Sequence, residues 1–120
     1  MSDSEVDASL LESFAEEAQR HCAVITAGLE TGTNDYEALR VEAHAMKGTA
    51  ATLGLRRLVE LAGLMESDLA DAAKSGELRD QRAKQIAEAA EAVAEGARAA
   101  ATGEEEPPDV GRSLAQLFSL

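Results

Sequence analysis

The sequence predicts an all-α protein, an antiparallel up-down bundle of four helices with a short C-terminal extension. Along four segments the apolar residues recur in steps of three and four, which places them on one face of a helix. The hydrophobic fraction of 45% is built mainly from alanine and leucine, a composition that favours helix over strand. The short connections between these segments indicate antiparallel neighbours. A chain of 120 residues is expected to form one such domain.

The first two predicted helices lie in the N-terminal half of the chain. We expect the first helix from about Ser4 to Leu29. Its apolar stripe comprises Leu11, Phe14, Ala18, Cys22, Ile25 and Leu29. Asn34 and Glu37 resemble a capping pair, so the second helix is expected to begin near Asp35 and to continue until Gly54. Its stripe comprises Tyr36, Leu39, Ala43, Met46, Ala50 and Leu53.

Two further helices are predicted by the same periodicity. The third is expected from near Leu55 to Ser75, where Gly76 can supply a left-handed stop. The fourth is expected from about Leu78 to Thr102. The stripe of the third comprises Leu58, Ala62, Met65, Leu69 and Ala72, and that of the fourth comprises Ala83, Ile86, Ala90, Val93, Ala97 and Ala100.

The C-terminal part of the chain differs in composition. Residues 103–111 are rich in Glu, Pro and Asp, and the adjacent Pro107 and Pro108 exclude a continuing helix, so we expect a linker or turn there. Residues 112–120 regain apolar character and can form a helical turn that docks on the bundle. The predicted organisation is therefore a bundle at 1–102, an acidic linker at 103–111 and a short apolar segment at 112–120.

Charge and cysteine content argue against several function classes. The net charge of −12 opposes binding to nucleic acid, whose phosphates need clustered Lys and Arg. Cys22 is the only cysteine, so neither an intrachain disulfide nor a multi-thiolate zinc site is expected. The two histidines and scattered carboxylates form no recognisable metal-ligand set, which disfavours a metal hydrolase. Neither a signal peptide nor a membrane span is indicated, and a cytoplasmic location is expected.

The candidate chemistry lies on the outward face of the second helix. At about 100° per residue, His44 falls roughly 130° from the centre of the apolar stripe, and Arg40, Lys47 and Gly48 share its face. An exposed neutral imidazole can act as a nucleophile. Lys47 can balance the charge of a phosphoryl group on that ring, and Arg40 can add to the field. Gly48 costs about 1 kcal/mol in a helix and removes a side chain beside His44, which favours access for a partner, with close helix packing as the alternative.

These residues form a motif that resembles a known family. The run Ala43-His44-Ala45-Met46-Lys47-Gly48-Thr49-Ala50, followed by Leu53-Gly54, is similar to the motif of the histidine phosphotransfer (HPt) family. The resemblance continues through Leu58, Ala62 and Met65-Glu66 and includes the stripe that starts at Leu11 and Phe14. It covers about residues 8 to 100. It implies a four-helix bundle that relays phosphate between receiver-domain aspartates, with no bound nucleotide.

The resemblance assigns a role to each motif residue. It implies that His44 accepts the phosphoryl group, that Lys47 is its basic partner and that Gly48 gives access to the loops of a receiver. Glu66 matches a position where the family carries Glu or Gln, and it lies about 80° from the stripe of the third helix, at an edge that faces a neighbour. We hypothesise that Glu66 accepts a hydrogen bond from Nδ1–H of His44, which leaves Nε2 unprotonated.

Some positions depart from the family pattern or stay undecided. Thr49 stands where the family often has serine, Ala51 where glycine is common, and Ala70 where some relatives place a basic residue. The charge at the site would then rest on the cations of the second helix alone. Val6 and Leu10 lie off the first apolar stripe, so they form either an exposed patch for a receiver helix or a surface covered by the C-terminal segment.

Together these features predict a phosphocarrier that is not an enzyme and needs no cofactor. The chain is expected to accept a phosphoryl group on His44 from a receiver phospho-aspartate and to relay it to another receiver. Expected partners are receiver domains and a hybrid histidine kinase, and we expect a monomer. No Gly-rich phosphate loop is present, so the chain cannot phosphorylate itself. Two alternatives stay open: the phospho-accepting first domain of a chemotaxis-type kinase, and a helical interaction module that transfers no phosphate.

Overall fold

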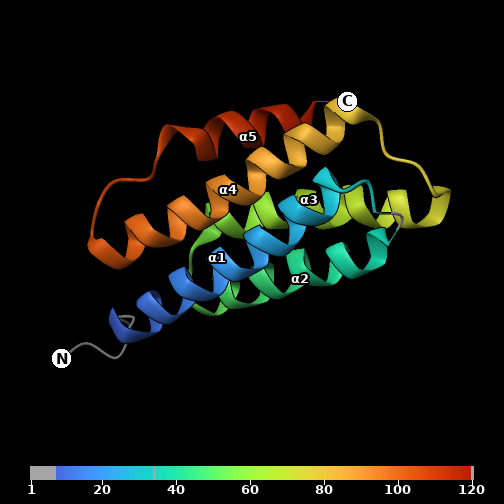
Figure 1. The fold of residues 1–120 in the computed structure, drawn as a ribbon. Coiled ribbons are helices and arrows are strands. Elements are labelled where there is room, and N and C mark those ends of the chain that lie inside the picture. The colour runs from blue at the N-terminus through green and yellow to red at the C-terminus, as the bar shows by residue number, and fades with distance from the viewer. Residues whose placement is uncertain (1–7, 34, 120) are drawn as a thin grey trace.

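The computed structural model describes residues 8–33 and 35–119, and the regular secondary structure in these ranges is helical throughout, which confirms the all-α prediction there. The helices are α1 (Ala8–Glu30), α2 (Tyr36–Thr52), α3 (Arg56–Ser75), α4 (Asp80–Thr102) and α5 (Pro108–Phe118). α1 packs against α4, α2 packs against α3, and further contacts join α1 to α2 and α3 to α4. Figure 1 shows these helices lying lengthwise beside one another.

The helix ends follow simple capping chemistry. Asp35 caps α2, because its Oδ1 accepts a hydrogen bond of 3.1 Å from the backbone N–H of Ala38. The predicted cap Asn34 and the predicted first-helix start at Ser4 both lie outside the described residues. Gly76 ends α3 with a φ of 79°, the left-handed stop that the sequence predicts.

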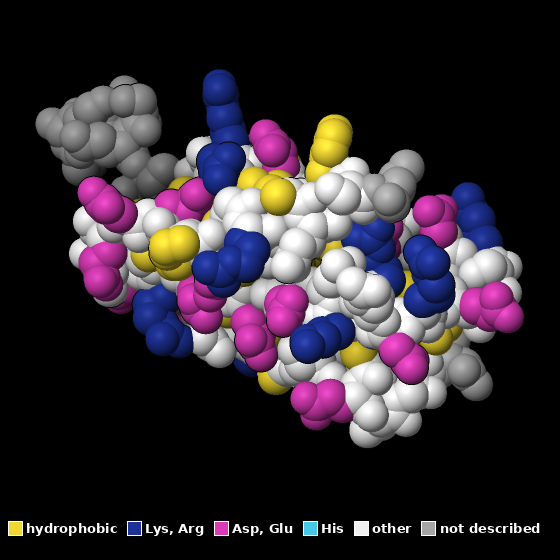
Figure 2. Space-filling view, turned by 90° about the horizontal axis from the view of Figure 1, so that it is seen from above, with side chains coloured by type: hydrophobic (Ala, Val, Ile, Leu, Met, Phe, Trp, Pro, Cys, Tyr) yellow, Lys and Arg dark blue, Asp and Glu magenta, His cyan; other side chains and the backbone are white. Residues whose placement is uncertain are grey.

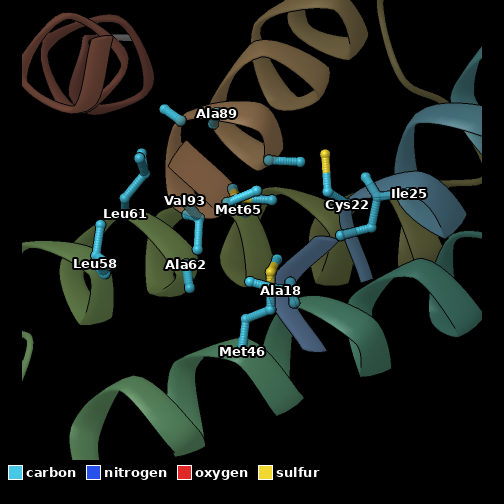
Figure 3. Packing of buried hydrophobic residues seen from close by; sticks show 14 of the residues in the cluster. Ala18, Cys22, Ile25, Met46, Leu58, Leu61, Ala62, Met65, Ala89 and Val93 are labelled. Carbon is cyan, nitrogen blue, oxygen red and sulfur yellow. The ribbon is translucent and has the colours of Figure 1, made fainter. Parts of the chain in front are cut away.

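The core lies where the predicted apolar stripes meet between the helices. Figure 3 shows Ala18 of α1, Met46 of α2, Met65 of α3 and Val93 of α4 converging, and each of these residues is 0% exposed. Tyr36, the first predicted stripe position of α2, is only partly buried. Burial of a larger apolar side chain such as Met or Val stabilises a fold by about 1.5–3 kcal/mol. This shared core fixes α2 relative to α3, the two helices that carry the predicted site residues.

The C-terminal region corrects the predicted boundary between linker and helix. α5 begins at Pro108, inside the expected linker, because proline is well tolerated in the first turn of a helix, where its missing N–H costs nothing. Val110 and Leu117 of α5 are buried against α3 and α4. A Cβ atom on Gly96 of α4 would lie 2.7 Å from Leu58 Cδ2 and 3.3 Å from Val110 Cγ2, so the glycine lets three helices approach closely. α5 is therefore an integral part of the packed structure.

The surface on the α5 side carries charges of both signs. Figure 2, which views the molecule from the side where α5 lies in Figure 1, shows Lys and Arg interspersed with Asp and Glu. No histidine is visible on this face. Among the described residues, no helix combines the length and apolar character that crossing a membrane requires.

We expect Val110→Ala to lower the free energy of unfolding by about 2 kcal/mol, because it removes two fully buried methyl groups and leaves a cavity between α3, α4 and α5. Urea denaturation followed by circular dichroism measures the change. Phe118→Ala on the same helix is the matched control, because Phe118 is 79% exposed and its loss should change stability by less than about 0.5 kcal/mol. Equal effects of the two substitutions would show that α5 does not pack as described.

Candidate functional site

His44 is presented to solvent from the middle of α2. Its side chain is 60% exposed, as the helical geometry of the sequence predicts. The Nδ1 atom of the ring lies 2.9 Å from Oε2 of Glu66 on α3, the contact that the sequence hypothesis named. His44 therefore combines an accessible ring with one nitrogen held by a neighbouring helix.

Glu66 brings the predicted site residues together. Its side chain is only 15% exposed, and it lies between three groups from α2. Oε1 lies 2.7 Å from Nζ of Lys47, and Oε2 accepts a hydrogen bond of 3.0 Å from Nη1 of Arg40 in addition to the contact with His44. One carboxylate thus joins both predicted cations and the histidine.

The protonation state of Glu66 decides which ring nitrogen of His44 carries the hydrogen. Burial raises the pKa of Glu66, but hydrogen bonds from Lys47 and His44, together with their charges, lower the pKa overall to below its ordinary value. The side chain is therefore an ionised carboxylate at neutral pH and can only accept hydrogen bonds. The nitrogen of His44 that faces it, Nδ1, must then carry the hydrogen, and in the neutral ring Nε2 holds the lone pair.

Gly48 lies one turn after His44, in open surroundings. A Cβ atom built on Gly48 would meet no atom of another described segment within 4 Å, so the packing of these residues does not need a glycine there. This finding removes the alternative of close helix packing. Glycine in the interior of a helix costs about 1 kcal/mol relative to alanine, so the residue reduces stability and leaves free space beside the ring.

Two features of the site were not predicted from the sequence. Glu37 binds Arg40 through both carboxylate oxygens, with two hydrogen bonds of 2.8 Å, whereas Asn34, its partner in the predicted capping pair, lies outside the described residues. The signal was their spacing of three residues on one helix, which brings side chains together. Gly63 of α3 lies opposite the lysine, because a Cβ on it would lie 3.6 Å from Cδ of Lys47.

The second histidine has a different environment. The side chain of His21 on α1 is only 18% exposed, whereas that of His44 is 60% exposed. Its Nδ1 lies 2.7 Å from Oε1 of Glu42, and its Nε2 lies 3.4 Å from Oε1 of Glu17. Both ring nitrogens therefore face carboxylates, and the ring offers no free nucleophile comparable to that of His44.

The open question about the first apolar patch is resolved in part. Leu10 is 53% exposed, so in this structure the C-terminal segment does not bury it. Val6 lies outside the described residues.

The fold and the site define an all-α domain whose second helix presents an exposed histidine held by a carboxylate of the third. The family model of the Hpt domain matches residues 9–107, and the chain belongs to this family. Membership implies histidine phosphotransfer in two-component signalling, by domains that carry phosphoryl groups rather than act as kinases. A search of curated proteins found no match.

Proposed function

We propose that the chain is a phosphocarrier that accepts a phosphoryl group on Nε2 of His44 from a receiver phospho-aspartate and passes it to another receiver. One observation carries the proposal: the exposed ring of His44 has its Nδ1 on the ionised carboxylate of Glu66, which leaves Nε2 for an incoming phosphorus atom. Family membership supports the same chemistry.

The transfer step needs no cofactor from this chain. The lone pair on Nε2 of His44 attacks phosphorus and forms the N–P bond, while the P–O bond to the aspartate breaks and its electron pair leaves with the carboxylate. The hydrogen on Nδ1 stays in place, and Glu66 stabilises the positive charge that the ring gains. Return of the phosphoryl group to a second receiver is the same step in reverse.

Lys47 and Gly48 complete the proposed site. The side chain of Lys47 is 36% exposed. Its ammonium group holds one of its three hydrogens toward Glu66, so the other hydrogens can meet phosphoryl oxygens. The open space at Gly48 admits the active-site loops of a receiver to in-line distance from the ring. Each residue thus supplies one of the two requirements of transfer, charge balance and access.

We propose that α1 to α4 form the up-down four-helix bundle of the family, which the alternating course of these helices in Figure 1 supports, with residues 103–120 as a C-terminal extension. The proposed partners are receiver domains and a hybrid histidine kinase, met by a monomer in the cytoplasm. No kinase activity of the chain's own is part of this proposal.

The decisive test mixes the chain with a receiver domain that carries phosphate on its aspartate. We expect the receiver to lose phosphate and the chain to gain it in acid-labile form, as an N–P bond requires. Binding of the receiver without any gain of phosphate would identify a non-transferring interaction module. Phosphate gained only from a chemotaxis-type kinase and ATP would identify the first domain of such a kinase instead.

A further inference from the structure

The two cations of the site are held very differently. Arg40 uses three of its N–H groups on carboxylates: Nε and Nη2 donate to the two oxygens of Glu37, and Nη1 donates to Oε2 of Glu66. Hydrogen bonding by Glu37, followed by the charges of Glu37 and Glu66, raises the pKa of Arg40 above its ordinary range. Within residues 8–33 and 35–119, the one ion pair of Lys47 is with Oε1 of Glu66. Arg40 therefore uses most of its N–H groups on Glu37 and Glu66, whereas the ammonium group of Lys47 keeps N–H donors for a ligand.

Arg40 and His44 contact the same oxygen atom of Glu66. Oε2 of Glu66 lies 3.0 Å from Nη1 of Arg40 and 2.9 Å from Nδ1 of His44, so both groups share one acceptor. With Lys47 alone on Oε1, the carboxylate could rotate and take Oε2 away from the ring. A planar guanidinium that Glu37 holds at its other edge would oppose that rotation.

We infer that Arg40 is a positioning residue that holds Oε2 of Glu66 against Nδ1 of His44, and that Glu37 anchors Arg40 for this task. The inference rests on the proposed function and changes the role expected for Arg40, which was to add to the field on the phosphoryl group. The two roles predict opposite effects of replacing Glu37 on the transfer rate. If Arg40 acts by its positive charge on the phosphoryl group, removal of the negative charge of Glu37 would strengthen that attraction and speed transfer. If Arg40 positions Glu66, the loss of Glu37 would free the guanidinium and slow transfer.

The experiment measures the rate of phosphoryl transfer from a phosphorylated receiver to the full chain and to its variants. We expect Arg40→Gln to be slower by about tenfold, the effect of losing one hydrogen bond to a charged group. Arg40→Lys should be equally slow, because an ammonium lacks the planar fork that binds both oxygens of Glu37 while it donates to Oε2 of Glu66. Glu37→Ala should be slower by about threefold to tenfold. Full activity of Arg40→Lys, or faster transfer by Glu37→Ala, would overturn the inference in favour of a field role.

Asp80→Ala is the matched control, because Asp80 is also an acidic residue in a first helical turn, that of α4. It should stay within about twofold of the unsubstituted chain, because surface substitutions away from the site change little. Thermal unfolding of all variants checks that slower transfer does not reflect loss of the fold.

A second readout needs no phosphate and separates the inference from the proposed function. Ring nitrogen chemical shifts from ¹⁵N NMR report which nitrogen of His44 carries hydrogen. We expect the Nδ1–H form to dominate in the unsubstituted chain and its share to fall in Arg40→Gln and Glu37→Ala. An unchanged share in both variants would overturn the positioning role. A shifted share in a chain that takes up no phosphate would contradict the proposed function and leave the positioning of the ring supported.

Discussion

We expect the His44→Gln chain to take up no phosphoryl group from a phosphorylated receiver. Glutamine is similar in length to histidine, and its amide N–H can still donate to Glu66, but an amide nitrogen has no available lone pair for attack on phosphorus. His44 is 60% exposed, so its replacement should leave the core and the thermal stability unchanged within about 0.5 kcal/mol. Transfer of radiolabelled phosphate, with unfolding curves of both proteins, measures the two effects.

His21→Gln is the matched control for this substitution. Both ring nitrogens of His21 face glutamates, so its replacement should alter contacts between α1 and α2 without removing the nucleophile. We expect this variant to gain phosphate to the full extent. Phosphate uptake that survives His44→Gln and disappears in His21→Gln would place the chemistry on α1 and refute the site described above.

Replacement of Gly48 should change stability and transfer in opposite directions. We expect Gly48→Gln to raise the free energy of unfolding by about 0.5–1 kcal/mol, because glutamine is the better helix former and the position is open. The same side chain occupies the space beside His44, and displacement of a reacting group by about 1 Å can slow a reaction roughly a hundredfold. Urea denaturation and the transfer assay measure the two quantities on one protein.

Two alanine variants separate size from helix propensity. Gly48→Ala should keep the gain in stability and most of the transfer rate, because one methyl group leaves the approach largely open. Gly96→Ala should not be more stable, because the added methyl group meets Leu58 and Val110 and the overpacking cancels the gain. Undiminished transfer by Gly48→Gln would mean that no partner approaches the ring from this side.

The sequence predicted α1 to α4 well because each is long enough for several turns of apolar stripe to be counted. The C-terminal helix was predicted to lie within residues 112–120, whereas α5 begins at Pro108. This helix spans only 11 residues, and proline is as common just after one helix as in the first turn of the next. Burial distinguishes a proline that begins a helix from one that follows a helix. Val110 is fully buried beside Gly96, and this contact between two helices cannot be read from the residues next to the proline.

The candidate site shows the same limit. Rotation about a helix axis gives the direction of a side chain, so it placed His44 outward and Glu66 at an edge within reach. The partners of Arg40 depend on side-chain conformation and on the distance between α2 and α3, which rotation does not supply. The sequence therefore predicted which residues gather at the site but missed that Glu37 and Glu66 both bind Arg40.

The measurement that tests the central claim most directly is NMR of the phosphorylated chain with ¹⁵N-labelled histidine. We expect coupling between ³¹P and Nε2 of His44, with hydrogen still bound to Nδ1 and its hydrogen bond to Glu66 intact. Phosphorus coupled to Nδ1 of that ring, or found on any other residue, would contradict it.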